Sequence, residues 1–172
     1  TIKNSHIHVN RSLDLTVSEI RINSTGKLDL VNTTVTTTAN ETYGTTTYTL
    51  VSDGGELSIQ DAQIHYGMVW LVGGNTSITN LLLDGYSLSN YGIFSEDTNL
   101  IASGVSIRNY TLGLRAIGSS PTLESVFYYN CSTWMTQEWW VTFSPVDSSI
   151  GLPIYGFEIR QWDTDGNMIG TW

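Results

Sequence analysis

The chain has 172 residues, of which 40% are hydrophobic and only 13% are charged, and its net charge is −9 at pH 7. This length supports one good core, or one core with a small second module. With only two lysines, the acidic balance excludes nucleic-acid binding and attachment to an anionic membrane surface, because both need cationic side chains.

The composition predicts an all-β chain. Thr (23) and Ser (19) make up about a quarter of the residues, only 3 are Pro, and there is no long run of helix-forming residues. No apolar run reaches the roughly 18 residues of a transmembrane helix. The only cysteine, Cys131, has no disulfide partner within the chain, and we expect it in the core.

One pattern recurs over the first 130 residues: two apolar residues two positions apart, a corner residue, and an apolar residue three positions later. It occurs at residues 2–7, 13–20, 28–35, 57–64, 78–83, 100–107 and 121–128. Apolar residues that alternate in this way form strands with one face inward. A repeat near twenty residues long predicts a parallel β-solenoid.

Polar residues occupy the corner in several copies of the pattern. Asn and Asp suit a corner because they tolerate left-handed backbone and hydrogen-bond locally. Equivalent residues stack about 4.8 Å apart in a solenoid. We therefore expect a ladder in one corner, with ordinary surface turns as the alternative. Its members are Asn4, Asn32, Asp61 and Asn80, and the corner passes to Gly104 and Ser125 in later copies.

Two other features interrupt or mark the repeat. A Thr-rich insertion at residues 36–50 surrounds an Asn-Glu-Thr-Tyr-Gly turn, which predicts a projecting hairpin or arm, or else a low-complexity loop. Further on, Gly67, Gly92 and Gly113 each precede a strand. Glycine there permits either a positive φ or close packing between turns.

The character of the sequence changes at Thr133, where a Trp-rich segment begins. Alternating strands and a turn at residues 163–167 follow, which is typical of antiparallel pairing. The expected domains are therefore a β-helix over residues 1–133 and a Trp-rich junction with an antiparallel β module over 134–172. Three or four strands are too few for a closed sandwich.

Residues 92–109, with Gly92-Ile93 and then Leu100-x-Ala102-x-Gly104-x-x-Ile107, resemble right-handed parallel β-helix proteins of the pectin-lyase-like superfamily over about residues 1–132. Residues 151–156 and 163–167 resemble the opening strands of Ig-like or carboxypeptidase-regulatory-like sandwiches. Together they resemble archaeal cell-surface proteins of the S-layer, sheath or filament type.

The resemblance to polysaccharide lyases and hydrolases raises the question of catalysis, which needs clustered carboxylates with Arg or Lys. The candidates are Asp61, Asp84, Glu96, Asp97 and Glu124, with His65, Arg108 and Arg115. They lie in different turns of the repeat, and the family's paired-Asp and His-Gly signatures are absent. We therefore expect no catalytic residues and no enzyme.

Two patterns suggest metal ligands. His6 and His8 share one strand face without a third ligand nearby, so we expect exposed strand residues. Asp163, Asp165 and Asn167 have the spacing of a calcium loop but lack its glutamate at position 12. Calcium is therefore the only cofactor that we consider. The alternative is that these residues form a plain β-turn between strands.

Seven Asn-x-Ser/Thr sequons point to an extracellular, cell-surface protein with N-linked glycans. Asn32 is set aside as a ladder residue. The expected glycan sites are Asn10, Asn23, Asn40, Asn75, Asn109 and Asn130.

The leading functional hypothesis is a structural subunit of an extracellular filament, sheath or surface layer, self-associating through open solenoid ends and strand edges. The first alternative is a carbohydrate-binding or adhesive module of a larger surface protein, with Tyr86, Tyr91 and Tyr110 stacking on sugars. The second alternative is a polysaccharide lyase or hydrolase.

Overall fold

The computed structural model describes residues 1–9, 18–37, 48–138, 160–162 and 168–171. The chain forms two compact units, Thr1–Trp140 and Val141–Trp172. Every regular element in the described ranges is a strand. None of the described residues belongs to a helix of the length and apolarity that crossing a bilayer requires.

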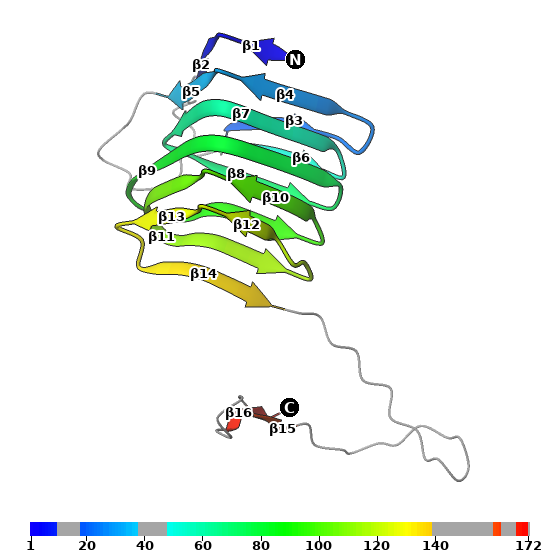
Figure 1. The fold of residues 1–172 in the computed structure, drawn as a ribbon, viewed down its shortest axis with the longest axis vertical. Coiled ribbons are helices and arrows are strands. Elements are labelled where there is room, and N and C mark those ends of the chain that lie inside the picture. The colour runs from blue at the N-terminus through cyan, green and yellow to red at the C-terminus, as the bar shows by residue number, and fades with distance from the viewer. Residues whose placement is uncertain (10–17, 38–47, 139–159, 163–167, 172) are drawn as a thin grey trace, which may run out of the picture. The chain divides into compact units, whose positions relative to one another are not determined.

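The first unit is a parallel β-solenoid whose strands stack into three faces (Figure 1). The first face contains β1 (Ile2–Lys3), β4 (Lys27–Val31), the starts of β7 (Glu56–His65) and β9 (Asn75–Glu96), β10 (Asn99–Ser103) and β12 (Thr122–Glu124). The second contains β2 (His6–Val9), β5 (Thr34–Thr37), later parts of β7 and β9, the start of β11 (Ser106–Ile117) and β13 (Phe127–Tyr129).

The third face contains β3 (Ser18–Ile22), β6 (Tyr48–Asp53), β8 (Gly67–Val72), the ends of β9 and β11, and β14 (Thr133–Glu138). All of these pairs are parallel. The predicted all-β parallel solenoid is thus confirmed, while its right-handed sense stays a prediction from the resemblance.

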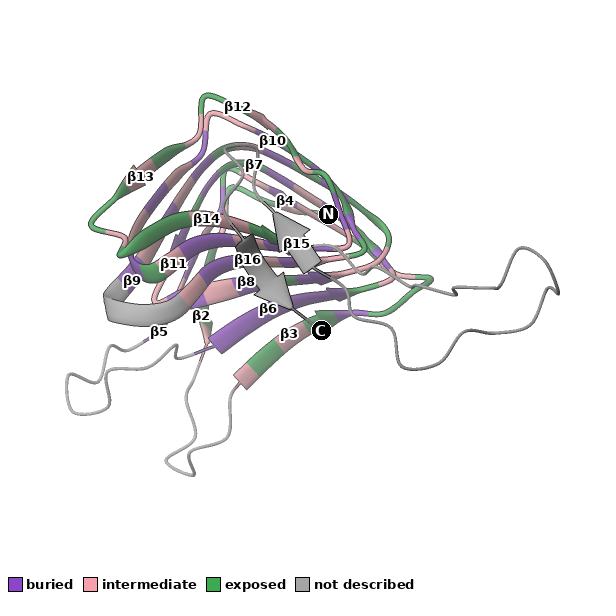
Figure 2. Cartoon of the chain, turned by 90° about the horizontal axis from the view of Figure 1, so that it is seen from below, coloured by how far each residue is buried: buried purple, intermediate pink, exposed green. Residues whose placement is uncertain are grey.

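The three faces enclose one apolar core. Figure 2 shows buried residues on strands of all three faces. On the first face, for example, Leu30, Ile59 and Ile78 lie directly above one another and are nearly inaccessible to solvent. Burying each such side chain contributes roughly 1.5–3 kcal/mol to folding. The alternation read from the sequence is therefore the in-and-out alternation of these strands.

Two buried tyrosines fill the wider parts of the core. The Tyr48 hydroxyl donates to the Val35 carbonyl at 3.0 Å, and the Tyr110 hydroxyl donates to the Gly67 carbonyl at 2.6 Å. A Cβ on Gly67 would lie 2.5 Å from the Tyr48 ring, and a Cβ on Gly113 would lie 2.5 Å from the Tyr128 ring. These glycines therefore serve close packing between turns, which was one of the two roles considered.

Two boundaries differ from those expected. The division at 133/134 falls inside the solenoid, because β14 pairs in parallel with β11 and completes the last turn. The Thr-rich insertion at 36–50 is also shorter than expected, since β5 and β6 take both of its ends and Tyr48 is wholly buried. Its central residues, 38–47, lie outside the described residues.

In the second unit, β15 (Arg160–Trp162) and β16 (Met168–Thr171) form an antiparallel pair. Antiparallel pairing is what the sequence predicted for this region. Kinship with Ig-like sandwiches stays a prediction.

Replacing Tyr110 by Phe removes the hydroxyl that satisfies the Gly67 carbonyl in the core. We expect a loss of about 1 kcal/mol in the free energy of unfolding, measured by urea denaturation of dilute chain. The matched control is Tyr129→Phe, because Tyr129 is exposed. Equal stability of Tyr110→Phe and wild type would contradict this assignment.

Candidate functional site

The first corner contains the predicted ladder residues. Asn4, Asn32, Asp61 and Asn80 all have positive φ, between 48° and 52°. The Asn32 amide donates to Asn4 Oδ1 and the Asn80 amide donates to Asp61 Oδ1, each at 2.9 Å. All four are exposed, so the bonded pairs lie on the outer surface of the corner. Gly104 and Ser125 keep the positive φ in the following turns.

A second ladder, which the sequence reasoning missed, lies in the next corner. The Asn130 amide donates to Asn109 Oδ1 at 2.9 Å, and the Asn109 amide donates to Asp84 Oδ1 at 2.7 Å. Asn109 and Asn130 also have positive φ. They are 21 residues apart, which is the period of the late repeat, so the sequence carried a signal for this ladder.

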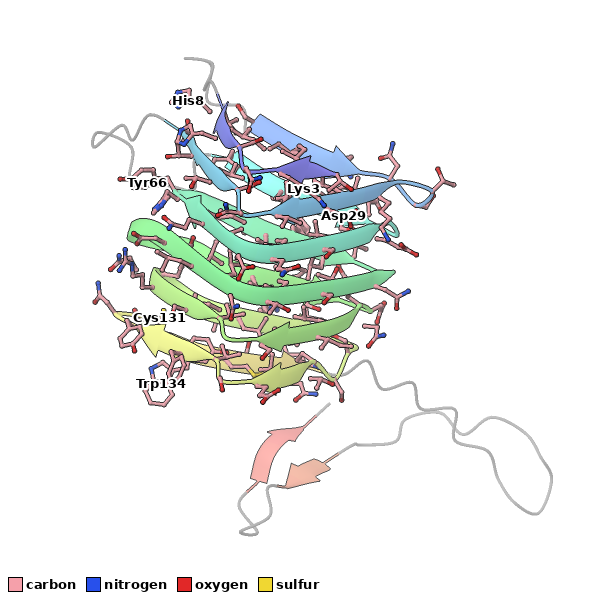
Figure 3. The ribbon with its side chains drawn as sticks, turned by 45° about the horizontal axis from the view of Figure 1, so that its top comes forward. Lys3, His8, Asp29, Tyr66, Cys131 and Trp134 are labelled. Carbon is pink, nitrogen blue, oxygen red and sulfur yellow. The ribbon has the colours of Figure 1, made fainter. Side chains whose placement is uncertain are left out.

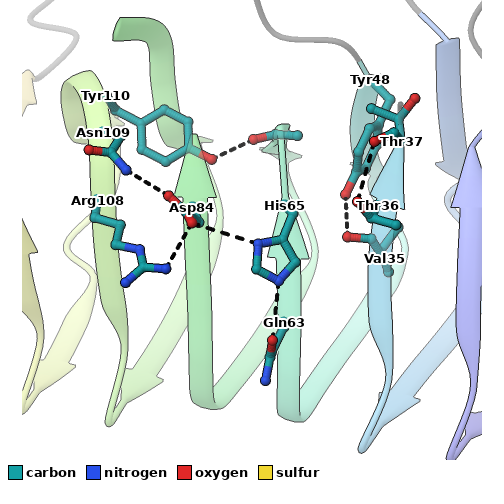
Figure 4. Close-up of polar contacts among 11 residues, drawn as sticks. Val35, Thr36, Thr37, Tyr48, Gln63, His65, Asp84, Arg108, Asn109 and Tyr110 are labelled. Atoms are coloured by element: carbon teal, nitrogen blue, oxygen red, sulfur yellow. Dashed lines mark hydrogen bonds and ion pairs between the residues drawn. The ribbon is translucent and has the colours of Figure 1, made fainter. Parts of the chain in front are cut away.

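Asp84 is the centre of a charged cluster in the outward column of the second face (Figure 4). Arg108 donates to Asp84 Oδ2 at 2.8 Å, and His65 Nδ1 lies 3.7 Å from the same oxygen. The Nε2 atom of His65 is 3.1 Å from Gln63 Oε1. The candidates His65, Asp84 and Arg108 lie in different turns of the repeat, as the sequence indicates, and the structure brings these three side chains together across the turns.

The electrostatics of Asp84 decide what the cluster can do. Burial of the Asp84 side chain, which is 16% exposed, acts to raise its pKa. Hydrogen bonds from Arg108 and Asn109, with the charges of Arg108 and His65, outweigh burial and hold the pKa below its ordinary value. An ionised carboxylate with both oxygens engaged is a weak general base and cannot donate a proton near neutral pH. The cluster is therefore an ionic clamp across three turns.

The remaining acidic candidates are distributed over the other corners. Asp61 belongs to the first corner, and Asp97, with φ of 48°, belongs to the third. Glu124 is exposed on β12. No described group of three or more His, Cys, Asp or Glu residues is placed to share a metal ion. The expectation of no catalysis stays a prediction.

Outward aromatic side chains form a cluster on the third face. Trp70 packs edge-on against Phe94 at 5.4 Å between ring centroids, and Tyr91 packs against Phe94 at 5.8 Å. The Arg115 guanidinium lies 5.6 Å from the Phe94 centroid and donates to both carboxylate oxygens of Glu138. Trp70 remains 39% exposed. We call these five residues the aromatic patch.

The aromatic patch differs from the tyrosines proposed for sugar stacking. Tyr91 belongs to it, but Tyr110 is wholly buried, so its proposed role as an exposed stacking residue is wrong. The side chain of Tyr86 lies outside the described part of the structure.

An open groove of about 310 Å³ crosses the outward side of the first face. Lys27 and Glu56 form an ion pair at 3.2 Å on its wall, and the Asn99 amide donates to Asn75 Oδ1 at 3.1 Å. These two pairs of polar side chains satisfy each other, whereas the Thr76 hydroxyl on the same wall has no hydrogen-bond partner among the described residues.

The last turn of the solenoid presents apolar side chains to solvent. Phe127, Tyr129 and Trp134 are 52%, 57% and 66% exposed. Each strand of this turn, β12, β13 and β14, has one hydrogen-bonded neighbour among the described residues. At the opposite end, β1, β2 and β3 also have one such neighbour each. Both ends therefore present strand edges.

The structure places the glycan candidates in two groups. Asn23 and Asn75 are exposed. Asn109 and Asn130 use their amide nitrogens in the second ladder, and a glycan would be attached to that same nitrogen. Asn10 and Asn40 lie outside the described residues.

The metal candidates are also placed only in part. His6 and His8 are exposed on β2, as expected for strand residues. Asp163, Asp165 and Asn167 lie outside the described residues, so the calcium loop stays a prediction. Cys131 is partly buried, with Sγ 3.7 Å from the Ile107 carbonyl oxygen.

No family model, curated protein or solved structure matches the chain.

The Asp84 clamp predicts a specific pH dependence. Because the folded pKa of Asp84 is depressed, its contribution to stability is complete above the unfolded pKa of about 3.9. It is lost as the pH falls through the folded pKa. At pH 7 we expect Asp84→Asn to lower the free energy of unfolding by about 1–2 kcal/mol, and this difference from wild type should shrink below about pH 4.

Urea denaturation between pH 7 and pH 2.5 measures this effect. Asp53→Asn is the matched control, because Asp53 pairs with Arg21 at an exposed site and should cost at most about 0.5 kcal/mol. A cost for Asp84→Asn that is independent of pH would contradict the clamp.

Proposed function

We propose that the protein is a structural subunit of an extracellular assembly, such as a filament, sheath or surface layer, and that it self-associates through the ends of its solenoid. The observation that supports this proposal is the last turn, where three exposed aromatic side chains accompany three strand edges. Such edges bind further strands unless they are covered.

The way in which the ends differ sets the kind of assembly. One end is made of β1, β2 and β3, and the other of β12, β13 and β14. Contact between unlike ends is heterologous and does not close on itself when the subunits stack along one axis. The product is a filament or tube.

The extracellular, cell-surface location in this proposal rests on the sequence. Seven sequons in an acidic chain rich in Thr and Ser favour a secreted protein that carries N-linked glycans. Asn23 and Asn75 are the described sequon residues whose exposure best suits attachment. The likeness to archaeal surface proteins is a part of the proposal that rests on the sequence pattern.

Sedimentation and negative-stain electron microscopy over a concentration series test self-association. We expect polymers that lengthen with concentration. Phe127→Ser with Trp134→Ser should reduce assembly, whereas Ile101→Ser, which removes an exposed apolar side chain from a lateral face, should not. A wild-type chain that stays monomeric at every concentration would refute the proposal.

Carbohydrate binding is a second candidate function, and the aromatic patch favours it. Exposed rings that are held by neighbouring rings and by an arginine offer a firm surface for a sugar ring, and Trp70 is the accessible member. In this case the lateral face would bind glycan while the ends bind other subunits.

A glycan array followed by titration tests this candidate. Trp70→Ala should weaken binding at least tenfold, and Trp134→Ala, which removes an exposed tryptophan from the last turn, should leave it unchanged. Absence of any glycan ligand, or binding that survives Trp70→Ala, would exclude the aromatic patch as the site.

A further inference from the structure

Equivalent residues of successive turns form columns along the solenoid. Each column has one end in the first turn and the other end in the last turn. On the first face, the strand pairing runs from Ile2 through Leu30, Ile59, Ile78 and Ala102 to Leu123. On the second it runs from Ile7 to Tyr128. On the third it runs from Ile20 to Met135. Each inward column therefore begins and ends in an apolar residue.

These six end residues are only partly buried, and all pack against the core. A second copy placed end to end in the same register would bring Leu123 over Ile2, Tyr128 over Ile7 and Met135 over Ile20. Each contact would stack one apolar residue on another, as adjacent turns inside the solenoid already do at a spacing of about 4.8 Å. The core would thus continue across the junction without a change of pattern.

The charges of the two ends are opposite. The described residues of the first turn, 1–9 and 18–22, contain two cationic side chains, Lys3 and Arg21, and one carboxylate, Glu19. The last turn, residues 122–138, contains Glu124 and Glu138 and has no Lys or Arg. A chain with a net charge of −9 thus keeps a cationic excess at one end, where Lys3 lies (Figure 3).

One pair of charges would meet directly. Lys3 and Glu124 are the two ends of a single outward column, which runs through Val31, Gln60, Thr79 and Ser103. Neither side chain has an ion-pair partner among the described residues. Another outward column of the first face already holds opposite charges in adjacent turns, as Lys27 and Glu56 show.

We propose that a second copy of this chain docks its first turn, β1–β3, onto the last turn, β12–β14, in the register that continues all three faces and pairs Lys3 with Glu124. This inference rests on the proposed self-association and adds the docking surfaces, their direction and their register. The partner is identical, and the contact joins unlike ends.

Charge reversal tests the register. Lys3→Glu and Glu124→Lys should each raise the concentration for half-assembly about tenfold, because attraction at every junction becomes repulsion. The double variant should return to within about threefold of wild type. Lys3→Glu makes the chain more acidic and Glu124→Lys makes it less so, so general repulsion between acidic chains would move the two variants in opposite directions.

Mixing the two single variants gives a second readout. In an alternating filament every junction again pairs opposite charges, so an equimolar mixture should assemble like wild type. Lys27→Glu is the control, because it changes the net charge as Lys3→Glu does but lies on a lateral face. Circular dichroism of dilute samples checks that all variants fold.

The outcomes separate the two proposals. Polymers that are insensitive to both single variants would overturn the register while leaving self-association in place. Stronger assembly of Glu124→Lys together with weaker assembly of Lys3→Glu would indicate that general repulsion between acidic chains controls assembly, and would also overturn it. A monomeric wild type would refute both proposals.

Discussion

Successive turns stack in parallel with equivalent residues about 4.8 Å apart, and this spacing decides which side chains each position accepts. A residue must suit the residues directly above and below it, since no other strand separates them. Tyr48 pairs with Gly67 in the next turn, and the glycine leaves room for the tyrosine ring. A large side chain fits inside the solenoid where the adjacent turn has a small residue at the paired position.

The same constraint acts on polar residues. Like charges 4.8 Å apart in one column would repel, and buried amides without partners would lose hydrogen bonds. Asp84 satisfies both requirements, because it lies between His65 and Arg108 in its column and accepts a hydrogen bond from Asn109. Lys27 and Glu56 repeat the alternation of charge on the first face. A junction that sets Lys3 beside Glu124 would extend this rule beyond one molecule.

The sequence predicted the solenoid because its signal is strong: alternating apolar residues, a regular period and Asn or Asp at the first corner. It did not predict the Asp84 clamp, because His65, Asp84 and Arg108 are separated by 19 and 24 residues, and this uneven spacing hides a shared column. The extra residues lie at the corner where the pairing register shifts between Arg108 and Tyr110. The same shift hides which side of the strand Tyr110 faces. The sequence predicts an exposed side chain, whereas Tyr110 is buried in the core.

The outward aromatic residues were missed for a different reason. Trp70 and Phe94 are apolar in strands rich in apolar residues, so pattern alone does not separate the inner from the outer face. The composition changes at Thr133 but the fold does not, because β14 keeps the parallel register of the solenoid.

Hydrogen–deuterium exchange of assembled against dispersed chain tests end-to-end stacking, because stacking in register protects backbone amides only at the strand edges that meet. We expect slower exchange on assembly in residues 1–9, 18–22 and 122–138, and unchanged exchange in β7, which is already paired on both sides. Protection confined to a lateral face, or none at either end, would contradict it.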